Sequence, residues 1–389
     1  MFYELAASTW DHEEIEALND VVASNRFTMG DRVREFEEQF AKHFGTKYAV
    51  MSNSGSSANL IATAALFFKK NRPLQRGDEA IVPALSWATT YHPLQQYGLK
   101  LKFVDIELDT LNIDVSQLER ALTPKTRLIV AVSILGNPAA LDVLRKFADK
   151  HGLYLLEDNC ESMGAELNGK QAGTFGDIGT FSFFFSHHIS TIEGGMSVTD
   201  SEELCHLMKA LRAHGWTRDL PPDSPIFEKR SGDFFEAYRF VLPGYNVRST
   251  EINAAIGMCQ LRKLDGFVDK RRQNLALFQR LFKGDDRFII QRENGKSSSF
   301  CFPIILNPAF NLNRERVLNA LKDADIGHRI ITGGNFLRHD VIRYYDYECV
   351  GEMTNANIAH DFGFFTGNHP YDLSKQIHKL RDVLNTACN

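Results

Sequence analysis

The chain has 389 residues, 43% of them hydrophobic, which is enough to bury a large core and too long for one ordinary domain. Its formal net charge of -5 at pH 7 argues against a general nucleic-acid binder. The six cysteines form no C-x-x-C pair and no cluster with histidine, so we predict neither a disulfide framework nor a metal site.

The N-terminal stretch contains early acids and no apolar segment of signal length. Nowhere does an uncharged apolar run reach about 18 residues, the length that a membrane span needs. Together with the cysteine usage, this predicts a cytoplasmic protein without a transmembrane helix.

Two polar helices are expected first in the chain, because apolar residues recur at spacings of three and four over 11–22 and 33–44. A short strand at 48–51 then leads through a small, polar turn into a long apolar helix. Gly55 and Ser56 open that helix, where free backbone amides and the helix dipole favour an anion such as a phosphate. The alternative is a serine that simply caps the helix.

A βαβ alternation follows. Strands are predicted over 78–83 and 101–105, and a strand beginning at Arg127, a helix over 141–151 and a strand beginning at Leu153 continue the pattern. Apolar strands separated by amphipathic helices imply a mostly parallel sheet covered on both faces. Ligands of such sheets gather at the carboxyl ends of the strands.

Two side chains stand at predicted strand ends. Trp87 follows the strand over 78–83, where its flat ring either stacks on a ligand or belongs to the core. Asp158 ends the strand that begins at Leu153, and it is costly to bury unless it meets a positive partner. Its alternative role is to cap a turn.

The stretch 180–199 predicts an apolar strand, a polar turn that holds His187 and His188, and a second short strand. Loops held by buried strands are well suited to position reactive groups. No lysine lies between Lys170 and Lys209. Because imidazole supplies no primary amine, this turn cannot bind a carbonyl compound as a Schiff base.

Beyond Arg248 the pattern changes to a long, charged helical run, typical of a bridge into a smaller domain. Arg271 and Arg272 lie in this run and are expected on its solvated face. From Ser298 onward, short strands and a helix over 314–323 predict a compact α+β unit.

Nine short motifs resemble, in register, the sugar aminotransferase family that uses pyridoxal phosphate (PLP), and within it a branch of nucleotide-sugar 3-dehydratases. They are STW from Ser8, FTMG from Phe27, SWATTYHPLQQYG from Ser86, LLEDNCESMGA from Leu155, SHH from Ser186, AHGWTR from Ala213, FVLPGYNVR from Phe240, GNFL from Gly334 and GNH from Gly367. The family's turn carries a lysine that binds the cofactor covalently. That lysine most often precedes the glycine pair by seven residues, which selects His187 as its replacement here.

The resemblance implies the type I fold of PLP-dependent transferases, an α/β fold with a mostly parallel, seven-stranded-type sheet. It implies a large cofactor-binding domain over 1–248, followed by a linking helix and a small α+β domain over 249–389. It also implies a homodimer with shared active sites, which binds PLP and pyridoxamine phosphate (PMP) without a covalent bond.

The same resemblance assigns roles to individual residues. It makes His187 the catalytic base, and it gives Asp158 the ring nitrogen and Glu161, where the family often has glutamine, a place near the ring hydroxyl. The other expected cofactor contacts are Gly55, Ser56 and Ser182 at the phosphate, Trp87 over the ring and Asn246 at the partner subunit's phosphate. His214 and Arg218 are candidate substrate contacts.

The implied reaction is dehydration. L-glutamate converts PLP to PMP, which condenses with the 4-keto group of GDP-4-keto-6-deoxymannose; a base then moves a proton, the 3-hydroxyl leaves, and water finally releases ammonia. Histidine suits the base because its ordinary pKa is about 6.5. The product, GDP-4-keto-3,6-dideoxymannose, belongs to the biosynthesis of dideoxysugars for lipopolysaccharide O-antigen.

Two alternatives stay open. One is an ordinary nucleotide-sugar aminotransferase, which the missing lysine disfavours. The other is a non-catalytic relative that binds a nucleotide sugar or PMP. The choice of GDP as the nucleotide rests on the resemblance alone.

Overall fold

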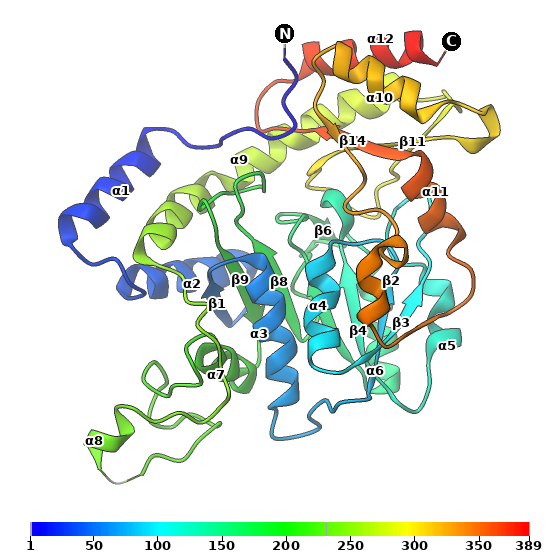
Figure 1. The fold of residues 1–389 in the computed structure, drawn as a ribbon. Helices are drawn as coiled ribbons and strands as arrows, with labels where there is room; N and C mark the ends of the chain where they lie inside the picture. The colour runs from blue at the N-terminus through cyan, green and yellow to red at the C-terminus, as the bar shows by residue number, and fades with distance from the viewer. Residues whose placement is uncertain (1, 231, 389) are drawn as a thin grey trace.

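The computed structural model describes residues 2–230 and 232–388, and its centre is a large sheet flanked by helices (Figure 1). The strands of this sheet are β1 (Tyr48–Ser52), β2 (Glu79–Pro83), β3 (Lys100–Val104), β4 (Thr126–Val132), β5 (Tyr154–Asp158), β8 (Ile178–Ser182), β9 (Gly195–Thr199) and β13 (Tyr347–Cys349). Their order is β1-β9-β8-β5-β4-β2-β3-β13. Only β9 runs antiparallel to its neighbours, so the sheet is mostly parallel.

Alternate residues of β4 show that both faces of the sheet are buried. Leu128 and Val130 pack in one core with helices α3 (Gly55–Phe67), α4 (Ala88–Gln96) and α7 (Glu202–Leu211). Ile129 and Ala131 pack in another core with α5 (Leu118–Ala121) and α6 (Leu141–His151). Burial on both faces explains why the strand reads as a continuous apolar run.

A smaller antiparallel sheet lies beyond the large one. It contains β10 (Phe288–Ile290), β11 (Cys301–Leu306), β14 (Gly363–Gly367) and β12 (His328–Arg329), in that order. Helices α10 (Arg314–Asp323) and α12 (Ser374–Ala387) cover it together with the end of α9 (Glu251–Phe282). The remaining helices are α1 (His12–Ser24), α2 (Asp31–Phe44), α8 (Asp233–Glu236) and α11 (Thr354–Phe362), and a hairpin joins β6 (Glu166–Leu167) to β7 (Lys170–Gln171).

The mostly parallel α/β architecture is confirmed, and the helices predicted over 141–151 and 314–323 coincide with α6 and α10. The large sheet has one strand more than expected, because β13 returns from the C-terminal half of the chain to pair with β3. The domain boundary at 248/249 stays a prediction. No helix of the described ranges is long and apolar enough to cross a membrane.

The expectation that Arg271 is solvated is wrong. Its side chain on α9 is only 2% exposed. It donates hydrogen bonds to the backbone carbonyls of Phe300, at 3.0 Å, and Asn368. The neighbouring Arg272 is half-buried and donates to the Ser297 carbonyl at 2.9 Å. Helix α9 extends from the core beside the large sheet to the core of the small sheet. In the middle of the helix, the segment around Phe300 covers its charged face.

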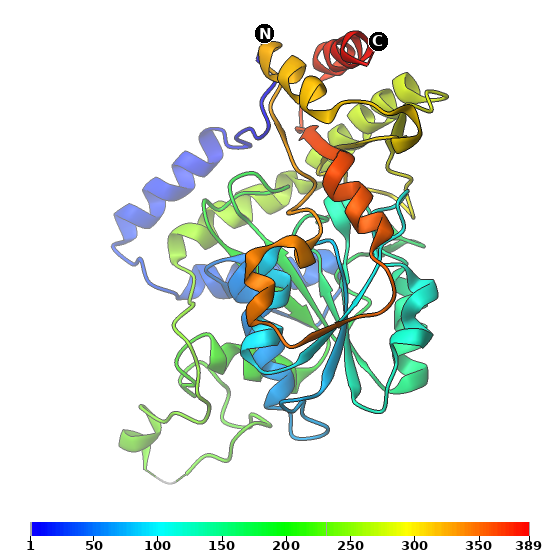
Figure 2. The same cartoon turned by 45° about the vertical axis from the view of Figure 1, so that its right-hand side comes forward.

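Residues 213–248, called the arm below, connect α7 to α9. Figures 1 and 2 show the arm with α8 near its tip, projecting away from the large sheet in both views. Its base stays attached to the sheet, since the Asn53 N–H donates to the Val247 carbonyl at 2.9 Å.

Candidate active site

The carboxyl ends of β5 and β8 bring the first site residues together. The two strands are parallel neighbours, and Asp158 lies in register with Thr180, two residues before Ser182. Asp158 is 6% exposed and Ser182 is 7% exposed. The predicted position of a ligand site at this edge of the sheet is therefore matched by buried polar side chains.

Asp158 is surrounded by hydrogen-bond donors. Its Oδ2 accepts from Asn59 Nδ2 at 2.8 Å and from Thr90 Oγ1 at 2.7 Å, and its Oδ1 accepts from the Cys160 N–H at 3.2 Å. Asn59 is fixed in turn, because its Oδ1 accepts from Thr180 Oγ1 at 2.6 Å. Three donors stabilise the ionised carboxylate and hold it in one orientation.

The start of α3 lies directly against this edge. Ser54 caps the helix by accepting from the Ser57 N–H at 3.1 Å, so the capping serine precedes Gly55 and leaves Ser56 free of that role. Gly55 is buried, and a Cβ there would lie 2.5 Å from Ser182 Cβ. Only glycine permits this close approach. Ser56 is exposed beside it, and the first N–H groups of the helix have no partner within the helix.

The turn after β8 holds both histidines. The half-buried His187 ring packs against Phe300 at 5.3 Å and Phe184 at 6.0 Å between centroids, and its Nδ1 has no hydrogen-bond partner. Burial lowers the pKa of His187 to about 4, although the nearby Cys160 backbone and Asp158 charge act in the opposite direction. The imidazole is therefore neutral at pH 7.

His188 points elsewhere. It is fully buried, and its Nε2 lies 3.2 Å from the Ser298 carbonyl. Its ring also contacts Phe300, at 5.8 Å between centroids. Burial lowers the pKa of His188 well below its ordinary value. The partner at Ser298 indicates a packing role.

Glu161 is the second carboxyl group of the site. It is half-buried, and its Oε2 accepts from the Leu135 N–H at 3.1 Å. Burial raises the pKa of Glu161 to about 7, and the charge of Asp158 adds to the shift. Glu161 is thus far easier to protonate than an ordinary glutamate.

Trp87 lies beyond the carboxyl end of β2 and is 57% exposed, so it is not a core residue. It precedes the first residue of α4. The GNFL motif lies beside it: Asn335 bridges to Leu85, and the Phe336 N–H donates to the Ala84 carbonyl at 2.9 Å. A segment from the C-terminal half of the chain therefore helps to build the rim of the site.

The other predicted site residues lie on the arm. Asn246 is exposed at the arm's base, where it accepts from Arg248 Nε at 3.1 Å. His214 is exposed, with a left-handed φ of 63°. Arg218 lies over the Trp216 ring, 5.1 Å from its centroid. These residues are not gathered around Asp158.

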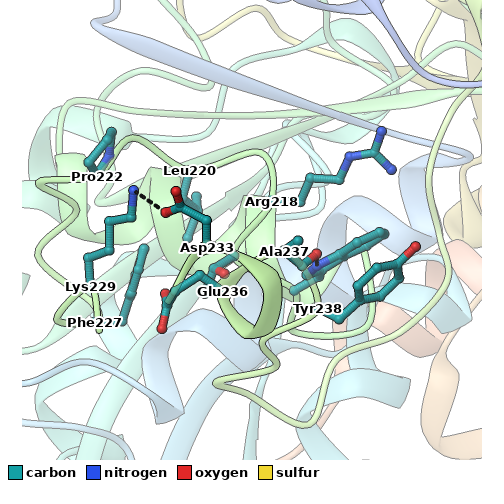
Figure 3. A pocket seen from close by; sticks show the side chains of 11 residues that line it. Arg218, Leu220, Pro222, Phe227, Lys229, Asp233, Glu236, Ala237 and Tyr238 are labelled. Carbon is teal, nitrogen blue, oxygen red and sulfur yellow. Dashed lines mark hydrogen bonds and ion pairs between the residues drawn. The ribbon is translucent and has the colours of Figure 1, made fainter. Parts of the chain in front are cut away.

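Arg218 lines a pocket of about 490 Å³ within the arm (Figure 3). The Lys229–Asp233 ion pair, 3.7 Å long, lies on one side of it, and Tyr238 lies on the other. Tyr238 stacks on Trp216 at 5.4 Å between centroids. The Trp216 indole is therefore contacted by both Tyr238 and Arg218.

Several residues of the site were not predicted from the sequence. Asn59, Thr90 and Thr180 build the surroundings of Asp158, and Phe300 supports both histidines. An asparagine one turn into the mostly apolar α3 is the signal that points to Asn59. No local signal identifies Phe300. Among the described residues, no cluster of three or more His, Cys, Asp and Glu could hold a metal ion.

Residues 8–364 match the DegT/DnrJ/EryC1/StrS aminotransferase family, and the chain belongs to this family. It is 51% identical over 384 residues to the GDP-4-keto-6-deoxy-D-mannose 3-dehydratase of Yersinia pseudotuberculosis, with 98% of each chain covered. The family predicted from the motifs is thereby confirmed.

Two solved structures extend this similarity. A crystal structure of GDP-4-keto-6-deoxymannose-3-dehydratase with a trapped PLP–glutamate geminal diamine matches with a TM-score of 0.97 and 49% identity, covering 98% of this chain and 100% of that one. A variant of the same dehydratase, ColD, has its adjacent serine and histidine replaced with asparagine and lysine. It matches with a TM-score of 0.95 and 49% identity, covering 97% of this chain and 100% of that one. The predicted transferase fold is confirmed.

Proposed function

We propose that this chain is a PMP-dependent dehydratase that removes the 3-hydroxyl of GDP-4-keto-6-deoxymannose to give GDP-4-keto-3,6-dideoxymannose. One observation carries the proposal: a half-buried, neutral His187, and no lysine, stands in the turn after β8, near Asp158. The dehydratases similar to this chain over nearly its whole length support the same substrate.

The residues fit a pyridoxal cofactor. Gly55 lets the start of α3 lie against Ser182, and Ser56, Ser182 and the backbone amides at this helix start would hold the phosphate. Asp158 would hold the ring nitrogen, Glu161 would lie near the ring hydroxyl, and the exposed indole of Trp87 would cover the ring. Bound there, the cofactor supplies an amine for the 4-keto group and a ring that accepts electrons.

Asp158 and His187 then have defined roles. Asp158, held in one orientation by its three donors, would accept a hydrogen bond from the ring nitrogen. His187, neutral at pH 7, accepts a proton from the carbon attached to the ring and returns it later. Because the turn lacks a lysine, the chain cannot trap the cofactor as a Schiff base, and the sugar is diverted from simple transamination.

Two observations support His187 over His188 as the base. The ColD variant alters a serine and the histidine that follows it, and this chain has a single Ser-His pair, Ser186–His187. His188 is fully buried with its Nε2 engaged at the Ser298 carbonyl, whereas the His187 ring is half-buried and feels the charge of Asp158.

L-glutamate is the proposed amino donor, and the glutamate adduct in the similar crystal structure supports it. We further propose a homodimer in which Asn246 contacts the phosphate bound by the partner, while His214 and Arg218 contact the substrate. The exposed position of all three on the arm supports this arrangement. The cytoplasmic location expected from the cysteine usage stays a prediction.

Product analysis tests the function. The purified chain is incubated with PLP, L-glutamate and GDP-4-keto-6-deoxymannose, and the sugar's mass, ammonia and 2-oxoglutarate are measured. A sugar lighter by one oxygen, with release of both ammonia and 2-oxoglutarate, is the expected result. An amino sugar without ammonia indicates an aminotransferase, and an unchanged sugar indicates a binding protein; either outcome contradicts the proposal.

A further inference from the structure

Asp158, at the carboxyl end of β5, and Glu161, three residues further along the chain, have unequal surroundings. Asp158 accepts three hydrogen bonds, whereas Glu161 accepts one, from the Leu135 N–H. Neighbouring carboxylates in a partly buried site do not both ionise readily. Glu161, with a single donor, partial burial and the nearby charge of Asp158, therefore retains a proton more readily than an ordinary glutamate.

The other titratable groups around Glu161 do not compete for this proton near neutrality. Burial raises the pKa of the Cys160 and Cys301 thiols well above the ordinary value, so both stay protonated. His187 has a pKa of about 4, and Arg271, which faces it from α9, has a pKa of about 10. Unlike these four groups, Glu161, with a pKa of about 7, changes its protonation between pH 6 and 8.

One oxygen of Glu161 remains free for a ligand. Its Oε2 is occupied by the Leu135 N–H, while its Oε1 makes no hydrogen bond within the described residues and is not among their buried unpaired atoms. The pKa of this carboxyl group is near neutral, and its Oε1 has no partner in the described part of the chain. Such an oxygen can exchange a proton with a bound molecule.

We propose that Glu161 is the proton store of this site: its carboxyl holds a proton at neutral pH and shares it with the ring hydroxyl oxygen of the bound pyridoxal cofactor. The proton moves from the carboxyl oxygen to the ring oxygen, and the negative charge moves to Glu161; no other bond changes. A glutamine at this position can donate an N–H but cannot release a proton. The inference rests on the proposed function, which places the cofactor ring against Asp158.

The pH dependence of the bound cofactor's absorption spectrum tests the proposal. With PLP bound, the wild-type chain is expected to show a spectral transition with its midpoint at about pH 7. Glu161→Gln abolishes this transition, whereas Glu161→Asp retains an ionisable group and shows a shifted one. Glu166→Gln removes a carboxyl that pairs with Lys296 outside the site, and it keeps the wild-type midpoint. A wild-type midpoint in Glu161→Gln overturns the proton store.

Proton uptake gives a second readout. PLP binding is measured by calorimetry in two buffers of different ionisation enthalpy, and the number of protons exchanged is expected to differ between wild type and Glu161→Gln at pH 7. Equal numbers contradict the proposal. Retention of PLP on gel filtration distinguishes the proposed cofactor site from the proton-store role of Glu161. If the wild-type chain retains no PLP, the cofactor site itself is overturned. If it retains PLP but the spectrum does not change with pH, only the proton store is overturned.

Discussion

The site at the ends of β5 and β8 and the arm at 213–248 are built in opposite ways. At the first, Asp158 is 6% exposed and its oxygens accept from Asn59 on α3, from Thr90 on α4 and from the N–H two residues further along its own segment. On the arm, Phe234 and Phe235 are 84% and 82% exposed. The surroundings of Asp158, called the completed site below, are therefore filled by donors of the same chain, whereas the arm presents apolar surface that a single chain leaves uncovered.

The largest effect is expected within the completed site, from His187→Asn. Asparagine is polar and of similar size but has no basic nitrogen, so the dehydration rate should fall by about 10²–10⁴-fold. Initial rates are followed by mass spectrometry of the sugar. His378→Asn, on the exposed face of α12, is the matched control and should keep the wild-type rate. If His187→Asn is as fast as the control, His187 is not the catalytic base.

Gly55→Ala tests whether phosphate binding depends on the close approach of α3 to β8. The added Cβ would lie 2.5 Å from Ser182 Cβ, so the start of the helix must move away. We expect PLP to bind about 10- to 100-fold more weakly, equivalent to about 1.4–2.7 kcal/mol. The measurement is a PLP titration by absorbance or fluorescence.

Gly266→Ala is the control for this change. No heavy atom lies within 4 Å of the Cβ that it adds, and the residue is inside α9. It should leave PLP affinity unchanged and stabilise the chain by up to about 1 kcal/mol, because alanine favours a helix. Equal PLP affinity in both variants would mean that the phosphate does not lie under α3.

The sequence predicted the parts of the site that are local in the chain. Asp158 ends an apolar strand, Gly55 begins a helix after a strand, and His187 lies in a turn between strands, so each has a signal within a few residues. The sheet edge then follows from the parallel arrangement of the strands. The element boundaries depended on periodicity, which the buried sheet obeys, whereas the choice of His187 as the base depended on the family resemblance.

The remaining parts depend on contacts between distant segments. Asn59 and Phe300 reach the site from other elements, and nothing in their own neighbourhood records that contact. Arg271 was misjudged for the same reason: a charged run on an amphipathic helix normally faces water. Here α9 extends from the core of one sheet to that of the other, and Arg271 donates hydrogen bonds to the carbonyls of Phe300 and Asn368 instead of facing water.

Glu161→Gln provides a smaller, pH-dependent test of the completed site. The folded-state pKa of Glu161 is raised from 4.5 to about 7, so its contribution to stability is full below pH 4.5 and is lost as the pH rises through 7. Glutamine suffers no such loss. Between about pH 5 and 8, the free energy of unfolding of the variant should therefore rise relative to wild type by on the order of 2 kcal/mol.

Denaturant unfolding of wild type and Glu161→Gln at both pH values measures this difference. Glu166→Gln, whose carboxyl is paired with Lys296, should follow wild type at both. If the difference between Glu161→Gln and wild type does not change with pH, Glu161 has an ordinary pKa in the folded chain.

The smallest effect on folding is expected on the arm, from the double variant Phe234→Ser, Phe235→Ser. Both rings are almost fully exposed, so the free energy of unfolding should stay within about 0.5 kcal/mol of wild type. If the arm meets a second copy of the chain, the same change exposes no new surface in the monomer but weakens the dimer. Light scattering should then show a lower mass at equal protein concentration. A loss of stability above about 1 kcal/mol at unchanged mass would instead show that the rings pack within their own chain.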